Sequence, residues 1–252
     1  MTADDHRLAH DLAVQAGHRL LELRADGGDP ASLRADGDRL AHEYLMGEFA
    51  RLRPDDAVLS EEGKDDSARL SATRAWIVDP LDGTREFGEA GRTDWAVHVA
   101  LWEQGELTAG AVALPAQQQT LSTMDQVTAP TADSQPVDGA RLRIVISRSR
   151  PPAFIERLAE LTDAELVPLG SAGAKVATVV RGEVDAYVHA GGQYEWDSAA
   201  PVAVARSRGL HASRIDGSKL AYNQAHPWMP DILVCRSELA GMLLDAIDSA
   251  GR

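Results

Sequence analysis

The residues from Trp76 to Thr84 read Trp-Ile-Val-Asp-Pro-Leu-Asp-Gly-Thr, and we expect the rest of the chain to be organised around them. The apolar start is typical of a short buried strand, so Asp79 and Asp82 stand where that strand ends. Pro80 cannot continue a hydrogen-bonded ladder, and Gly83 lets the backbone bend sharply. The pattern therefore predicts two carboxylates that are folded toward one point.

A metal ion is the simplest way to hold two such carboxylates together. Two anions in a partly dry pocket repel, and one takes up a proton unless a cation lies between them. Carboxylates with a main-chain carbonyl suit Mg²⁺, and no His or Cys is placed to favour zinc. The alternative is a capped surface turn, because Asp, Pro and Gly are common in ordinary turns.

Composition limits the class of protein. With 252 residues and 44% apolar content, the chain suffices for one large domain or two packed halves. The single cysteine, Cys235, excludes an internal disulfide framework and fits a reducing compartment. The first ten residues are polar and no run reaches membrane-spanning length, so we expect a cytoplasmic protein that does not cross a membrane.

The net charge of −14 repels polyanions, so we expect no nucleic acid polymer as a partner. A small anionic substrate remains open, since bound divalent ions reverse the local sign of a carboxylate-lined pocket.

Apolar spacing predicts a layered α/β fold in two halves, residues 1–128 and 139–252, separated by a polar stretch at 127–139. Helical spacing marks 8–23 and 40–52, and either Asp36 or Asp38 could be the N-cap of the second helix. We expect first-half strands at 57–59, 76–78, 95–102 and 107–114, with another near Leu121. In the second half we expect strands at 142–147, 165–169, 184–189 and 231–235, and helices at 152–161, 172–181, from near 197 and from 237.

Three motifs in order resemble the signature of the inositol monophosphatase superfamily. These are Glu61-Glu62, the stretch Asp79–Thr84, and Glu195–Pro201, which reads Glu-Trp-Asp-Ser-Ala-Ala-Pro. The resemblance implies the αβαβα sugar-phosphatase-like fold, metal-dependent phosphomonoesterase activity and sensitivity to lithium. The run Thr84–Phe87 is similar to the 3'(2'),5'-bisphosphate nucleotidase branch, whereas inositol monophosphatases usually have Asn before the aromatic residue.

The resemblance also implies roles for individual residues. The expected ligands of two or three Mg²⁺ ions are Glu61, Asp79, the carbonyl of Leu81, Asp82 and Asp197. Thr84 and Glu61 would orient the attacking water, and Asp82 would act beside them. Most of these ligands belong to the first half. The second half contributes Asp197 and a substrate loop, Gly170–Lys175, which resembles the loop that meets the nucleoside in the nucleotidase branch.

For the substrate, we expect contacts from the main-chain N–H groups of Gly83 and Thr84 and from Ser171, Lys175 and Asp197. Lys175 could equally be a surface residue. Asp38 stands where the family has an Asp near a third, looser ion, although no Thr precedes it in the usual spacing. Arg148 lies in a segment that often reads Ser-x-Ser-His in this branch, and here Arg150 replaces the His. We expect His98 to be a sheet residue and not a ligand.

The implied activity is removal of the 3'-phosphate from 3'-phosphoadenosine 5'-phosphate, and from its sulfated relative, in sulfur assimilation. The alternatives are an inositol monophosphate or fructose 1,6-bisphosphate phosphatase and, from another class, a non-catalytic cation-binding scaffold. A homodimer is common in the family, and the resemblance allows one here.

Overall fold

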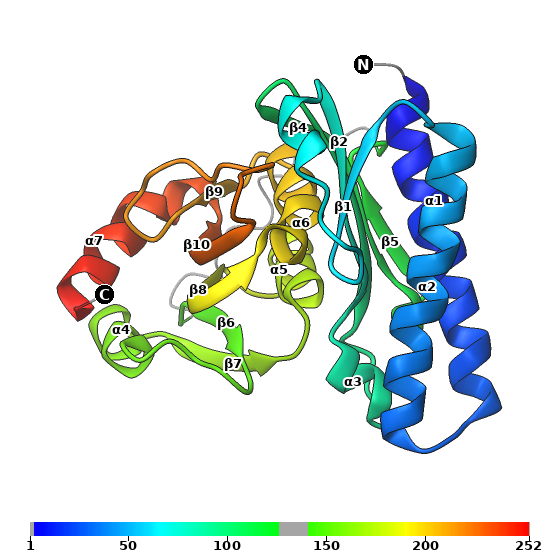
Figure 1. Cartoon of the computed structure of the whole chain (residues 1–252). Coiled ribbons are helices and arrows are strands. Elements are labelled where there is room, and N and C mark those ends of the chain that lie inside the picture. Colours follow the sequence, from blue (N-terminus) through cyan, green and yellow to red (C-terminus); the bar gives the residue numbers. More distant parts are fainter. Residues whose placement is uncertain (1–2, 126–140, 252) are drawn as a thin grey trace.

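The structure is a computed structural model, and it describes residues 3–125 and 141–251. The chain forms five layers, in which helices and sheets alternate across the molecule (Figure 1). This is the αβαβα arrangement that the sequence implied. The polar stretch predicted to separate the halves, 127–139, lies outside the described residues.

Two long helices form the first layer, α1 (Ala3–Asp26) and α2 (Pro30–Leu52). The sequence prediction of the α2 N-cap was wrong, because Asp29 caps the helix by accepting from the N–H groups of Ala31 and Ser32. Asp36 and Asp38 lie inside the helix instead. The cap lies earlier than expected because Pro30 is at the first helical position, where its missing N–H costs nothing.

The second layer is a five-stranded sheet in the order β1-β2-β3-β4-β5. Its strands are β1 (Ala57–Ser60), β2 (Arg74–Asp82), β3 (Ala96–Glu103), β4 (Glu106–Leu114) and β5 (Gln119–Ser122). β1 is parallel to β2, and the other neighbours are antiparallel. The short helix α3 (Thr84–Gly88) follows β2 directly.

The other sheet also has five strands, in the order β7-β6-β8-β10-β9. These are β6 (Arg143–Ser147), β7 (Glu165–Leu169), β8 (Ala186–Tyr194), β9 (His211–Ser213) and β10 (Trp228–Cys235). The sequence did not predict β9, which is only three residues long.

Helices α5 (Ala172–Val180) and α6 (Glu195–Ser207) lie between the two sheets (Figure 1). Their apolar residues and those of both sheets form one buried cluster, which includes Ile77, Val145, Ala177 and Val202. Helices α4 (Ile155–Thr162) and α7 (Ala240–Ala250) cover the outer face of the second sheet. Since both halves contribute to the central core, α5 and α6 carry residues of the second half to the end of β2.

No described helix combines the length and the apolar composition that crossing a bilayer requires.

Candidate active site

Three carboxylates meet where β2 ends and α6 begins. Asp79 and Asp82 come from β2 and Asp197 from the first turn of α6, and each offers an oxygen within 4.8 Å of the others. The ladder between β2 and β3 is irregular between Asp79 and Asp82, where Pro80 has no N–H to donate. Gly83 then turns the chain with a φ of 86°, a left-handed conformation that favours glycine. This local geometry brings both aspartates of the turn toward one point, as the sequence indicated.

Each of the three carboxylates is fixed by a main-chain donor. Oδ1 of Asp79 accepts from the N–H of Leu81 at 3.0 Å, and Oδ2 of Asp197 accepts from the N–H of Tyr194 at 2.6 Å. Oδ2 of Asp82 accepts from the N–H of Gly173, on the first turn of α5, at 2.7 Å. Because the protein holds one oxygen of each group, the orientation of the carboxylates is set before any ligand binds.

Burial, together with repulsion between the carboxylates, raises the pKa values of most acidic groups at this site. Burial and the charges of Glu61 and Asp82 raise the pKa of Asp79 well above its usual value. Burial and the charge of Asp82 raise the pKa of Asp197 to about 6. Glu61 follows β1 and is not one of the three converging carboxylates. Although the residue is partly open to solvent, desolvation on its side facing Asp79 and the charges of Asp197 and Asp82 raise its pKa to about 7. Without a cation the cluster therefore retains protons near neutral pH.

The pKa of Asp82 is shifted in the opposite direction. Burial would raise the pKa of its carboxyl, but His98, Lys175 and Ser171 lower it to about 2. The hydroxyl of Ser171 donates to Oδ2 of Asp82 at 2.5 Å, and Nε2 of His98 lies 3.2 Å from the same oxygen. Asp82 is thus a fixed anion in the metal-free protein.

His98 is the residue whose role the sequence did not reveal. It is fully buried on β3, as expected of a sheet residue, yet it contacts a carboxylate of the site. Nδ1 donates to the carbonyl of Trp196 at 3.1 Å. Burial would lower the pKa of His98, but the charge of Asp82 raises it. Only the register between β2 and β3, which pairs His98 with Asp79, could have indicated this contact.

The donor set fits a divalent cation. Converging carboxylate oxygens of fixed orientation are the ligands that Mg²⁺ prefers, and bound positive charge would relieve the repulsion that raises the pKa values of Asp79 and Asp197. In the part of the chain that the structure describes, no histidine or cysteine belongs to the group of converging ligand atoms.

Thr84 and Asp38 contact each other beside the carboxylates. Oγ1 of Thr84 lies 3.1 Å from Oδ1 of Asp38 and 3.0 Å from the carbonyl oxygen of Leu81, and can donate to either. Burial and the charge of Glu62 raise the pKa of Asp38 to about 6. Thus Asp38 reaches the site from the middle of α2, and the carbonyl of Leu81 faces the hydroxyl of Thr84.

A cavity of about 390 Å³ opens beside the cluster. Its lining includes Asp82, Gly83, Thr84 and Asp197, and it extends along the start of α5. A cavity of about 770 Å³ elsewhere shares no lining residue with it and includes none of the converging carboxylates. The smaller cavity is therefore the candidate active site.

Lys175 is buried and lines this cavity. The alternative prediction, that it is a surface residue, was therefore wrong. Nζ donates to the carbonyl oxygens of Gly170 at 3.1 Å and Ser171 at 2.7 Å, and lies 5.3 Å from the centre of the Tyr187 ring. Burial lowers the pKa of Lys175 against the charges of Asp82 and Glu86. The helical position of Lys175 places its ammonium group back over the loop that precedes α5.

Two arginines line the cavity, and a third, Arg148, is held by acidic partners. Arg150 and Arg85 line the cavity. Arg148 is not among its lining residues, because its guanidinium donates to Glu86 at 2.5 Å and to Glu89 at 2.6 Å. The positive charge nearest the substrate space is therefore that of Arg150, Arg85 and Lys175.

Comparisons with known proteins agree with this geometry. Residues 8–251 match the model of the inositol monophosphatase family, so the chain belongs to that family. It is 50% identical over 254 residues to the 3'-phosphoadenosine 5'-phosphate phosphatase of Mycobacterium leprae (96% of this chain and 93% of the relative) and 52% identical over 244 residues to that of Mycobacterium tuberculosis (94% and 91%). Among solved structures, CysQ from Bacteroides thetaiotaomicron is similar, with a TM-score of 0.76, 26% identity and coverage of 92% of this chain and 97% of that one.

Proposed function

We propose that this protein is an Mg²⁺-dependent phosphomonoesterase that hydrolyses the 3'-phosphate of 3'-phosphoadenosine 5'-phosphate to yield AMP and phosphate. The observation that carries the proposal is a carboxylate cluster that opens into a cavity with cationic groups beyond the reacting end. The identity of about half of all residues with two phosphatases named for this substrate supports the choice of nucleotide. Its sulfated relative has the same 3'-phosphate and is proposed as a second substrate in sulfur assimilation.

The proposed metal ligands are Glu61, Asp79, the carbonyl of Leu81, Asp82 and Asp197, which would hold two or three Mg²⁺ ions. Bound Mg²⁺ would neutralise charge on the transferring phosphate and on the leaving oxygen, and would make water more acidic. Asp82 is suited to hold a cation at any pH near neutrality, because its carboxyl is already ionised. Asp38 lies next to Thr84 and is the proposed neighbour of a further, looser ion.

The chain's own groups orient the reactants. We assign the orientation of the attacking water to Glu61 and Thr84, because a carboxyl whose pKa is about 7 can accept a proton from it and a hydroxyl can direct it. The reacting phosphate lies against the N–H groups of Gly83 and Thr84, which begin α3. Asp197 contacts the part of the substrate next to that phosphate.

The rest of the nucleotide occupies the cavity along the start of α5. Lys175 and Ser171 form one wall, and Arg150 and Arg85 are placed to meet the second phosphate. An inositol monophosphate has no second phosphate and would leave these cations without a partner. A non-catalytic scaffold would not need Thr84 or a cavity beside its ions.

Mg²⁺ as the specific ion, a cytoplasmic location and a homodimer belong to the same proposal. The oxygen ligands support Mg²⁺, and the single, buried cysteine supports a cytoplasmic location. The homodimer rests on membership of the family alone.

The experiment is a titration of the purified protein with Mg²⁺ at a fixed concentration of 3'-phosphoadenosine 5'-phosphate, with phosphate release and AMP formation measured together. Equal, Mg²⁺-dependent amounts of both products are expected. Cation binding without phosphate release would favour the scaffold, and release of the 5'-phosphate would overturn the assigned orientation of the nucleotide.

A further inference from the structure

The substrate loop, Gly170 and Ser171 between β7 and α5 with the first turn of α5, forms one wall of the active-site cavity and is stabilised by contacts of its own. Ser171 has a φ of 43°, a conformation that side chains rarely adopt, and its hydroxyl accepts from the N–H of Ala174 at 3.0 Å. The ammonium group of Lys175 bonds the carbonyl oxygens of Gly170 and Ser171. The shape of the loop is therefore set by a non-glycine residue with positive φ and by a buried cation.

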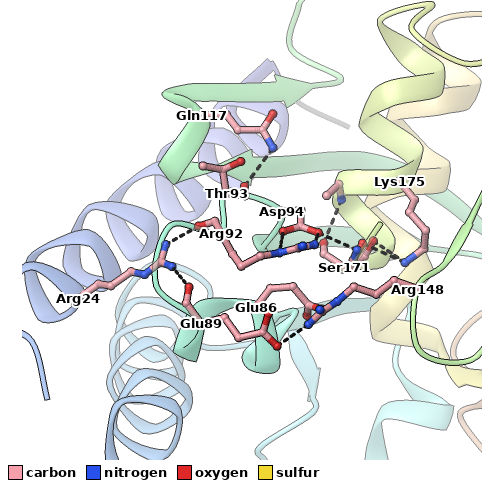
Figure 2. Close-up of polar contacts among 12 residues, drawn as sticks. Arg24, Glu86, Glu89, Arg92, Thr93, Asp94, Gln117, Arg148, Ser171 and Lys175 are labelled. Atoms are coloured by element: carbon pink, nitrogen blue, oxygen red, sulfur yellow. Dashed lines mark hydrogen bonds and ion pairs between the residues drawn. The ribbon is translucent and has the colours of Figure 1, made fainter. Parts of the chain in front are cut away.

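The first half of the chain fixes where this loop lies. The N–H of Gly170 donates to Oδ2 of Asp94 at 2.7 Å, and Asp94 is itself paired with Arg92. Figure 2 shows Asp94 between Arg92 and the start of α5. Arg24 donates to the carbonyl oxygens of Arg92 and Glu89. Asp94 is only 6% exposed, so the loop would leave a buried carboxylate partly unsatisfied if it moved.

The side chain of Glu86 also lies against Gly170. A Cβ atom at position 170 would lie 2.3 Å from Cγ and Cδ of Glu86, so any larger residue there would force the Glu86 side chain to move. Glu86 is 5% exposed, which makes its carboxylate dependent on a partner. Gly170 is thus enclosed between Asp94 and Glu86.

Arg148 supplies that partner. Its Nε donates to Oε1 of Glu86 at 2.5 Å and its Nη2 to Oε1 of Glu89 at 2.6 Å, while its own N–H donates to the carbonyl of Leu169 at 3.0 Å (Figure 2). Arg148 therefore connects α3, which follows the Asp79–Asp82 turn, to the end of β7, which leads into the substrate loop.

We propose that Glu86 and Arg148 are positioning residues that set the distance between the substrate loop and the carboxylate cluster, and so determine affinity for the part of the substrate beyond the reacting phosphate. The proposal rests on the proposed function, since it requires a substrate with a large group beyond that phosphate. It assigns a structural role to Glu86 within the motif Thr84–Phe87, in addition to the place of Glu86 in the cavity lining. Loss of the pair would displace Gly170 and Lys175, while the hydrogen bonds of Ser171 and Gly173 to Asp82 would keep the metal ligands in place.

The test compares Arg148→Met and Glu86→Gln with the parent protein on two substrates, 3'-phosphoadenosine 5'-phosphate and p-nitrophenyl phosphate. The measured quantity is the ratio of the two kcat/KM values. Both variants should lower that ratio by about tenfold, because a displacement of about 1 Å in a binding group can cost up to about 100-fold. Arg148→Lys keeps one charged contact and should fall between the parent and Arg148→Met.

The matched control is Arg157→Met, which removes an arginine from an exposed pair with Glu160 on α4 and should leave the ratio unchanged. A second readout avoids turnover: calorimetry with AMP, which carries the nucleoside and the 5'-phosphate. The dissociation constant for AMP should rise about tenfold in Arg148→Met and stay the same in Arg157→Met.

The outcomes separate the two proposals. A parent protein without activity on 3'-phosphoadenosine 5'-phosphate refutes the proposed function itself. With an active parent, an equal loss on both substrates or an unchanged affinity for AMP in the Glu86 and Arg148 variants overturns the positioning role. If Arg148→Met does not fold, Glu86→Gln and Arg148→Lys give the same decision.

Discussion

The hydroxyl of Ser171 donates to Oδ2 of Asp82 over 2.5 Å, and this bond joins the substrate loop of the second half to a carboxylate of the first. The same oxygen accepts from Gly173 and lies beside His98. A residue expected to bind a metal ion and a loop expected to bind the nucleotide are therefore in direct contact.

Asp197→Asn should remove most activity, by at least about 100-fold, because a group that orients and stabilises charge in the transition state is lost. Its metal-free form should be more stable than the parent near neutral pH, by on the order of 2 kcal/mol, because the raised pKa of about 6 shows that the folded state disfavours the charge. Thermal unfolding in EDTA and phosphate release in Mg²⁺ measure the two effects. A normal turnover at saturating Mg²⁺ would remove Asp197 from the ligand set.

Asp82→Asn should lose activity similarly but have the opposite effect on stability. The pKa of Asp82 is lowered to about 2, so its charge stabilises the folded state through His98, Lys175 and Ser171. The amide would leave the buried His98 facing a weaker partner, and the metal-free variant should unfold at a lower temperature than the parent. A gain in stability equal to that of Asp197→Asn would show that simple crowding of anions governs Asp82 as well.

The metal-free protein should be more stable near pH 5 than near pH 8. The folded-state pKa values of Glu61 and Asp197, about 7 and about 6, lie above their ordinary values, so the unfolded chain loses these protons first. The stability that these groups contribute is therefore fully present below their unfolded-state pKa values and is lost as the pH rises to the folded-state values. Melting temperatures in EDTA across this range test the slope, and Mg²⁺ should remove most of it. A flat profile in EDTA would mean that the pKa values of these carboxyl groups are not raised in the folded protein.

Thr84→Ala should lower kcat by about 10- to 100-fold, because the hydroxyl that directs the attacking water is lost. The affinity for Mg²⁺ should change by less than about twofold, since the carboxylates remain in place. Thr84→Ser keeps the hydroxyl near Asp38 and Leu81 and is the matched control. Calorimetry with Mg²⁺ beside steady-state rates separates the two quantities, and an equal loss of metal affinity would contradict the role.

Lys175→Met should weaken binding of 3'-phosphoadenosine 5'-phosphate more than that of p-nitrophenyl phosphate. It should also destabilise the protein by about 1–3 kcal/mol, because two buried carbonyl groups lose their donor. KM values for both substrates and a urea unfolding curve provide the measurements. Equal changes in KM for the two substrates would exclude Lys175 from the nucleotide site.

The strand before Asp79 and the helical spacing of α1 and α5 could be predicted from the sequence, because local apolar periodicity determines them. The convergence of Asp79 and Asp82 could also be predicted, since Pro80 and Gly83 leave the chain few other conformations. Contacts between strands and between the two halves of the chain could not be predicted. His98 reaches Asp82 through strand register, and Arg148 reaches Glu86 across 62 positions of sequence, and neither relation leaves a local signal. The N-cap of α2 was misplaced because several aspartates near its start satisfy the same capping preference.

The central claim is the choice of substrate, and one comparison tests it most directly. The catalytic efficiencies of the protein on 3'-phosphoadenosine 5'-phosphate, inositol 1-phosphate and fructose 1,6-bisphosphate are measured at one Mg²⁺ concentration. We expect a clear preference for the nucleotide, by about 100-fold or more, because it has both a second phosphate for Arg85 and Arg150 and a purine for the rest of the cavity. Inositol 1-phosphate lacks the second phosphate, and fructose 1,6-bisphosphate lacks the purine. A preference for inositol 1-phosphate would contradict the assignment.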